Sequence, residues 1–147
     1  MGPSDFWQGV VPVKEGTVRK NRNVGKRGVV ASILLMWILT FLELPKPLGF
    51  ETRSQENVSR AWLLLFVVIL VCEVWAMVAV FRRPVLGAKL ALVAAVLNIF
   101  QIIADQTHMM QPEVAPFAYS LLEYSVGVVS LGLMYFAWKI LRPKAVL

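Results

Sequence analysis

The sequence predicts an all-α integral membrane protein in which four helices cross the bilayer as an up-down bundle, with both chain ends on the cytoplasmic side. Three observations lead to this fold. Of the 147 residues, 58% are hydrophobic and only 16% are charged, a balance too apolar for a soluble domain of this length. The hydrophobic residues form four long runs that end at proline or charged residues. The positive charges favour alternate connections between these runs.

The first predicted span covers about 29–44 and follows a basic segment, residues 1–28. It ends at Glu43 and a Pro-Lys-Pro sequence, where proline stops a helix. This run is shorter than the roughly 20 residues that a bilayer requires. Tilt, local thinning or a continuation through Gly28 must therefore supply the remaining length. The polar start is unlike a cleavable signal, so we expect the span to remain as an anchor.

The other three spans have lengths that suit a bilayer. The second covers about 61–81 and ends at an Arg-Arg-Pro sequence, and the third covers about 85–104. The fourth covers about 117–141 and leaves a short tail, residues 142–147. Because short connections make consecutive helices antiparallel neighbours, these spans predict a compact up-down bundle.

Small residues recur at every fourth position of the third predicted span, from Gly87 through Ala91 to Ala95. Others lie along one side of the fourth span around Gly127. Small side chains let membrane helices approach closely. We therefore expect the third and fourth spans to pack tightly together.

The lysine and arginine residues orient the spans. Twelve of the fifteen lie in the N-terminal segment, around the turn at 82–89 or near the C-terminus, while three lie in the connection at 45–60. The connection at 105–116 has none. Since positive residues favour the cytoplasmic side, both termini and the 82–89 turn are predicted to be cytoplasmic.

The N-terminal segment mixes hydrophobic residues with cations, a composition that could lie on anionic lipid headgroups. The expected headgroup contacts are Arg19, Lys20, Arg22, Lys26 and Arg27. A partner subunit could hold this arm instead, or its charges could only set the orientation. Its glycine and proline content argues against one long helix.

The residue types present exclude several kinds of chemistry. Cys72 is the only cysteine, so the chain has no internal disulfide, thiolate zinc cluster or CxxC redox pair. His108 is the only histidine, so the chain alone cannot ligate haem through two histidines. The net charge of +6 sits at the ends of apolar runs, which indicates a membrane surface rather than nucleic acid. No GxSxG or HExxH motif is present. We expect no cofactor and lean against an enzyme.

Besides Glu43, which ends the first run, three acidic residues lie inside or at the end of the apolar runs. Glu73 is near the middle of the second span, Asp105 at the end of the third, and Glu123 in the fourth. An acidic residue at the centre of a membrane helix costs roughly 3 kcal/mol and is normally tolerated only when it faces the bundle interior or a wet cavity. Glu73 is therefore the strongest candidate for a functional residue.

A polar stripe follows one face of the third predicted span. Its members, Asn98, Gln101, Asp105 and His108, are spaced by three, four and three residues. This spacing places them within roughly 80° of one another on a helix. Because facing lipid would leave their donors and acceptors unsatisfied, we expect the stripe to face inward. The candidate ligand-binding or proton-binding residues are Glu73, Asn98, Gln101, Asp105 and Glu123.

These polar residues also allow two other interpretations. Polar side chains often form hydrogen bonds between membrane helices without any ligand, and that role alone could explain the stripe. Asp105, His108 and Glu123 could hold a divalent metal through one imidazole and two carboxylates. There is no second histidine and no paired Glu-x-x-His motif, so we predict no metal site.

Two functions follow from this pattern. The first is a non-catalytic integral subunit or scaffold of a larger membrane complex, packed against other membrane proteins, pigments or further copies of itself. The second is a binder, carrier or enzyme for a small lipophilic or cationic molecule, using Glu73, Asp105 and Glu123 around a pocket that opens away from the cytoplasm. The small size of the chain and its lack of catalytic motifs favour the subunit.

Overall fold

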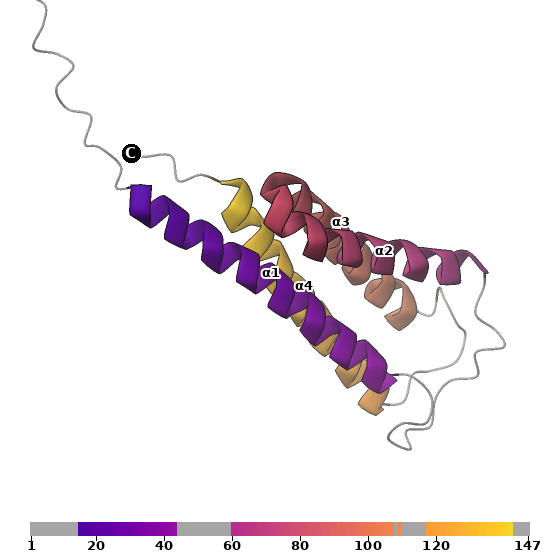
Figure 1. Ribbon diagram of the computed structural model, residues 1–147. Coiled ribbons are helices and arrows are strands. Elements are labelled where there is room, and N and C mark those ends of the chain that lie inside the picture. The colour runs from indigo at the N-terminus through magenta and orange to yellow at the C-terminus, as the bar shows by residue number, and fades with distance from the viewer. Residues whose placement is uncertain (1–14, 44–59, 108, 110–116, 143–147) are drawn as a thin grey trace, which may run out of the picture.

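The computed structural model describes residues 15–43, 60–107, 109 and 117–142. Within this part of the chain every regular element is an α-helix (Figure 1). All four helices are long and apolar enough to cross a membrane, as the sequence predicted. They are α1 (Glu15–Glu43), α2 (Arg60–Arg82), α3 (Pro84–Gln106) and α4 (Phe117–Leu141).

Arg83 alone separates α2 from α3, so these two helices form a hairpin without a loop. The backbone N–H of Arg83 donates to the Ala79 carbonyl at 2.7 Å, and the Arg83 carbonyl accepts from the Gly87 N–H at 3.0 Å. Pro84 takes the first position of α3, where a helix does not need the N–H that proline lacks. The sharp stop that the Arg-Arg-Pro sequence predicted is therefore confirmed.

The first helix starts earlier than the sequence predicted. α1 begins at Glu15 and runs unbroken to Glu43. The part of it that is long and apolar enough to span a membrane is Arg22–Leu42, which starts before the predicted residue 29. The expectation that glycine and proline prevent one long helix is wrong for this stretch. Pro3 and Pro12 both precede the helix in sequence.

The glycines of α1 lie where α4 comes close. A Cβ atom on Gly25 would be 2.7 Å from Cγ1 of Ile140, and one on Gly28 would overlap the Phe136 ring. Replacing either hydrogen with a methyl group would push the two helices apart. The contact with α4 therefore offsets the low helix propensity of glycine.

The helices pack as two antiparallel pairs joined along one side. α1 lies along α4, α2 lies along α3, and α3 also packs against α4, while α1 and α2 touch much less (Figure 1). The N-terminal end of α1, the α2–α3 turn and the C-terminal end of α4 lie at the same end of the bundle (Figure 1). The helices alternate in direction as predicted, but α1 packs mainly against α4, the last helix, and little against α2, the next one in the sequence.

The small residues of α3 allow a close approach to α2. A Cβ atom on Gly87 would lie 2.5 Å from Cα of Val80 and 2.9 Å from the carbonyl carbon of Ala79. On α4, a Cβ atom on Gly127 would be 3.5 Å from Cδ1 of Ile102, which is an ordinary contact. The closest approach at a glycine of α3 is therefore the one between Gly87 and α2. The sequence predicted instead that the small residues of this helix contact the fourth span.

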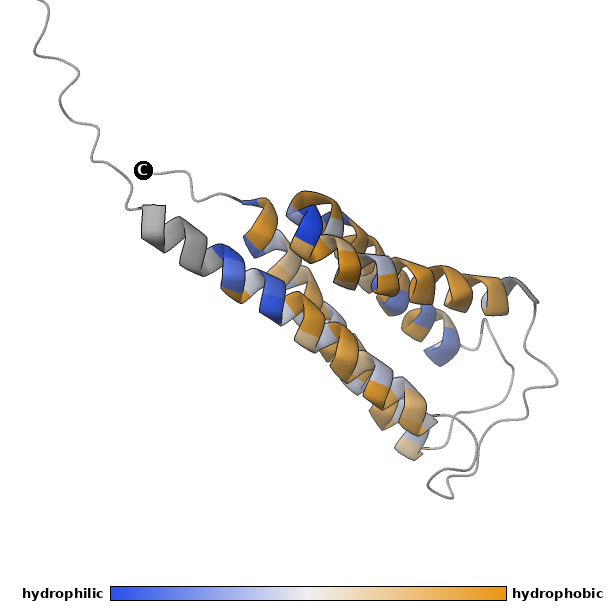
Figure 2. Ribbon diagram, in the orientation of Figure 1, coloured by the Kyte–Doolittle hydropathy of each residue, from blue (hydrophilic) through white to orange (hydrophobic). Residues whose placement is uncertain are grey.

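Hydrophobic residues run along all four helices (Figure 2). Their side chains lie on the outside of the bundle as well as in its core. Leu64, Trp75 and Val128 are each more than 60% exposed. Helices that are apolar all round are typical of a membrane environment. The lysine and arginine side chains that the structure describes lie in or beside the parts of the helices nearest the α2–α3 turn; these are Arg22, Lys26, Arg27, Arg82, Arg83, Lys89, Lys139 and Arg142. Arg60, whose side chain is outside the described set, begins α2 at the opposite end.

Candidate functional site

A buried carboxylate lies in the middle of the bundle. Glu73 is 4% exposed and sits on the inner face of α2 with Ile69, Ala76 and Val80, a set spaced by three or four residues as one helix face requires. Trp37 of α1 donates its indole N–H to Oε2 of Glu73 at 2.6 Å. Glu73 is thus buried on α2, and its hydrogen-bond donor Trp37 comes from α1, 36 residues earlier in the sequence.

The second carboxylate oxygen is also occupied. Nδ2 of Asn98, on α3, donates to Oε1 of Glu73 at 2.9 Å. The indole and amide donors are both neutral groups. Glu73 therefore joins α1, α2 and α3 through its own two oxygen atoms.

Met36 brings the fourth helix into the same group. The hydroxyl of Ser130, which is fully buried on α4, donates to the Met36 sulfur at 3.3 Å. Nδ2 of Asn98 lies 3.9 Å from the same sulfur atom, which is a weak acceptor. We refer to Met36, Trp37, Glu73, Asn98 and Ser130 as the central cluster. It takes at least one side chain from each of the four helices.

A second polar group joins α3 to α4 near the end away from the α2–α3 turn. Nε2 of Gln106 donates to Oε2 of Glu123 and lies 3.4 Å from the Ser120 hydroxyl. The Tyr124 hydroxyl donates to Oε1 of Gln106 at 3.2 Å. Glu123 is only 7% exposed. We call Gln106, Ser120, Glu123 and Tyr124 the end cluster.

Two further polar residues lie on α3. Gln101 lies between the central cluster and the end cluster, and Asp105 directly precedes Gln106 of the end cluster. Asp105 is 5% exposed, and Gln101 is half-buried. The Oε1 atom of Gln101 is buried and accepts no hydrogen bond from the described part of the chain. His108, the last member of the predicted stripe, lies outside the described residues.

The structure divides the candidate residues between two places. Glu73 and Asn98 are in direct contact, whereas Glu123 is held by Gln106. Asn98 and Gln106 are eight residues apart on one helix, which corresponds to about 12 Å along its axis. A single site that uses Glu73 and Glu123 together would have to span this distance.

Several residues of these clusters were not among the sequence candidates. Trp37 was counted as part of an apolar run, although a buried indole N–H usually requires an acceptor. Gln106 lies one position off the predicted stripe. Ser130 is one of the small residues that the sequence placed along one side of the fourth span, where only close packing was expected of it. No sequence signal set Met36 apart.

The remaining predicted positions are placed as follows. Arg22 and Arg27 are exposed on α1 and Lys26 is half-buried. Arg19 and Lys20 belong to α1, but their side chains are outside the described set. Among the described side chains, no three of the histidine, cysteine, aspartate or glutamate type come together as a metal site.

Comparison with protein-family models, with curated proteins and with solved structures finds no match to this chain. What the chain does is therefore inferred from its own contacts. The central cluster, the exposed apolar faces and the uneven charge of the two bundle ends are the features that bear on function.

Proposed function

We propose that the chain is a multi-pass integral membrane protein, with both termini cytoplasmic, that serves as a non-catalytic subunit or scaffold of a larger membrane complex. The observation that carries this proposal is the closed central cluster. Both oxygens of Glu73 accept hydrogen bonds from Trp37 and Asn98 of the same chain. A carboxylate has about four acceptor positions, and the two in use on Glu73 hold it to α1 and α3 of its own chain. Here the buried acid holds helices together.

The outer face of α2 supports a partner within the membrane. Trp75 is 61% exposed and lies seven residues before Arg82, about 10 Å from that end of the helix. Tryptophan usually lies at the membrane surface, where its N–H can meet water. An exposed indole at this depth would face hydrocarbon without an acceptor. A neighbouring protein or pigment that packs on α2 would supply one.

Extraction of the tagged chain from its native membrane in a mild detergent tests the subunit proposal. We expect the chain to elute with partner protein in a particle larger than the chain in its own micelle. Trp75→Leu should reduce co-elution several-fold, because it removes the exposed indole. Trp138→Leu is the matched control, since Trp138 is also exposed but lies near the basic end of α4.

Elution of the chain alone, with no loss of its role in the membrane, would contradict the subunit proposal. A second function, binding of a small cationic or lipophilic molecule, is favoured by one observation at the other end of the bundle. There Asp105 and Glu123 are both nearly buried, and Oε1 of Gln101 lacks a donor among the described residues. A solitary chain whose ligand binding is abolished by Glu123→Gln would establish that function instead.

Reporter fusions test the proposed orientation. A fluorescent protein at the C-terminus should fold and fluoresce, and alkaline phosphatase at the same place should be inactive, because both results require a cytoplasmic end. Alkaline phosphatase inserted in the connection at 110–116 should be active. The reverse pattern at both positions would show that the bundle has the opposite orientation.

A further inference from the structure

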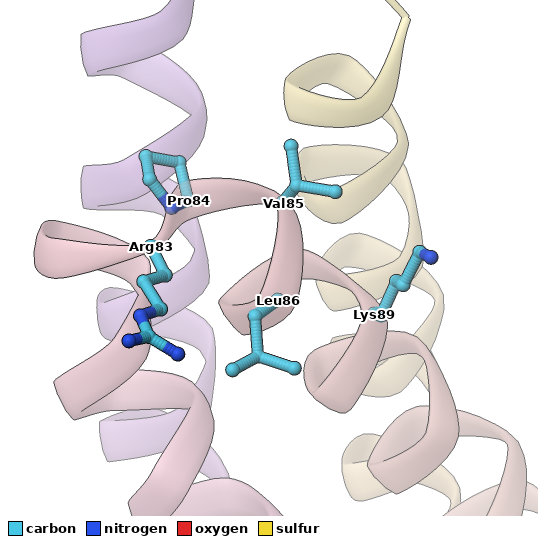
Figure 3. Close-up of a pocket in the computed structure, with 5 residues that line it drawn as sticks. All are labelled: Arg83, Pro84, Val85, Leu86 and Lys89. Atoms are coloured by element: carbon cyan, nitrogen blue, oxygen red, sulfur yellow. The ribbon is translucent and has the colours of Figure 1, made fainter.

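The α2–α3 turn carries a surface hollow at the basic end of the bundle (Figure 3). Its volume is about 350 Å³, and it is lined by Arg83, Pro84, Val85, Leu86 and Lys89. All of these side chains are exposed except that of Pro84, which is half-buried. The hollow therefore combines two cations with an accessible aliphatic surface, and none of these five described residues is acidic.

The two cations lie on either side of the aliphatic part. The side chains of Arg83 and Leu86 point to the same side of the turn, and Lys89 follows on the next turn of α3 (Figure 3). Leu86 and Lys89 are three residues apart, which makes them neighbours on one helix face. Leu86 lies between the two cations, and the Lys89 amine points away from it (Figure 3), so a ligand on Leu86 meets Arg83 on one side and reaches Lys89 at the other end of the hollow.

The backbone adds to this positive character. The Arg83 side chain does not cap α3, and Pro84 has no N–H group. The N–H groups of Val85 and Leu86 belong to the first turn of the helix, where they have no carbonyl partner in the helix itself. They carry the partial positive charge of a helix N-terminus. The C-terminal end of α2, one residue away, carries the opposite partial charge, so Arg83 and Lys89 supply most of the attraction for an anion.

We infer that the hollow binds the phosphate headgroup of an anionic phospholipid, with the start of an acyl chain lying on Val85 and Leu86. Charge complementarity selects an anion, and the exposed aliphatic lining favours an anion that carries hydrocarbon. Basic pockets at the ends of membrane helices are suited to such headgroups. This inference depends on membrane insertion of the bundle, and it does not depend on the subunit role.

Other cations at the same end of the bundle are engaged by aromatic rings. Nζ of Lys139 lies 5.6 Å from the centre of the Tyr135 ring, and the Arg142 guanidinium lies 4.2 Å from that of Trp138. Such contacts hold a cation on the protein surface. Lys139, together with Arg82 at the end of α2, provides a matched pair of charges outside the hollow.

Lipid titration of the full-length protein in detergent tests the inference. The probes are phosphatidylglycerol and phosphatidylcholine, with binding measured by native mass spectrometry. The double variant Arg83→Gln with Lys89→Gln should weaken phosphatidylglycerol binding on the order of tenfold or more and leave phosphatidylcholine binding unchanged. Arg82→Gln with Lys139→Gln removes the same charge and should have a much smaller effect. The charge-retaining pair Arg83→Lys with Lys89→Arg should bind like the parent protein.

Equal losses in the two glutamine pairs would overturn the inference, because they would show attraction by net charge alone. Phosphatidylglycerol binding that is unchanged in the Arg83 and Lys89 pair would also overturn it. Inorganic phosphate is the final probe, added as a competitor. If it displaced phosphatidylglycerol at equal concentration, the hollow would be a general anion site rather than a lipid site.

Discussion

Replacing Glu73 with alanine is expected to lower the free energy of unfolding by about 2–4 kcal/mol. The change removes the acceptor for the Trp37 indole and the main acceptor for the Asn98 amide. The indole then has no acceptor in the central cluster, and the amide has only the Met36 sulfur at 3.9 Å. We expect the lower part of this range if the separated helices find other hydrogen-bond partners within the membrane. Unfolding in mixed detergent micelles, followed by circular dichroism, measures the loss.

The conservative variant separates hydrogen bonding from simple loss of volume. Glu73→Gln keeps an acceptor for Trp37, and the Asn98 amide can turn over to accept from the new NH₂ group. It should therefore retain more than half of the stability that alanine removes. Cys72→Ala is a neighbouring control on another face of α2. If Glu73→Ala were as stable as the parent protein, the central cluster would not be what holds the four helices.

Adding side-chain volume at Gly87 is expected to have the largest effect on packing. Even the methyl group of Gly87→Ala would meet the Val80 backbone, whose Cα is 2.5 Å from the new atom. Backbone atoms cannot move aside as a flexible side chain can, so α2 and α3 must separate. We expect Gly87→Ala to cost about 1–3 kcal/mol and Gly87→Leu to prevent normal assembly. Thermal unfolding and size-exclusion chromatography in detergent check both results.

Gly127 provides the matched control on α4. A methyl group there would be 3.5 Å from Cδ1 of Ile102, which is an ordinary contact distance. Gly127→Ala should therefore be neutral or stabilising by up to about 1 kcal/mol, because alanine has the higher helix propensity. If the two alanine variants lost the same stability, the close approach of α3 to α2 would not explain the effect at Gly87.

The four helices could be predicted because a bilayer imposes strict local demands. A spanning segment must satisfy its backbone hydrogen bonds internally and remain apolar over a set length. The fourth span was predicted at about 117–141, and α4 runs from Phe117 to Leu141. The Arg-Arg-Pro stop was equally clear, since proline and charge together are incompatible with a continuing apolar helix.

The early start of α1 could not be predicted in the same way. Helix propensity treats Gly25 and Gly28 as weak points. These glycines are suited to the helix because they let α1 approach Ile140 and Phe136 of α4, which lie more than a hundred residues later in the sequence. A local pattern has no access to a contact of that range.

The candidate site was only partly predictable for a related reason. Helical periodicity identified Asn98 and the inward direction of its face, and hydropathy identified Glu73. Which donor meets which acceptor depends on the order of the helices around the bundle. The donation by Trp37 requires α1 to approach α2 at one level, and the choice of Gln106 as the partner of Glu123 depends on the end of α3.

The pairing of α1 with α4 has a consequence for biosynthesis. At about 5–20 residues per second, a ribosome needs several seconds to extend the chain from Glu43 to Phe117. In the proposed membrane-inserted state, α1 would stay without its main partner during that interval, while the α2–α3 hairpin could already close. Gly25 and Gly28 then expose a bare strip of helix backbone until the last span emerges. In that case the packing of α4 against α1 and α3 would complete the bundle, and a nascent chain truncated before residue 117 should leave α1 available to the insertion machinery or to a chaperone.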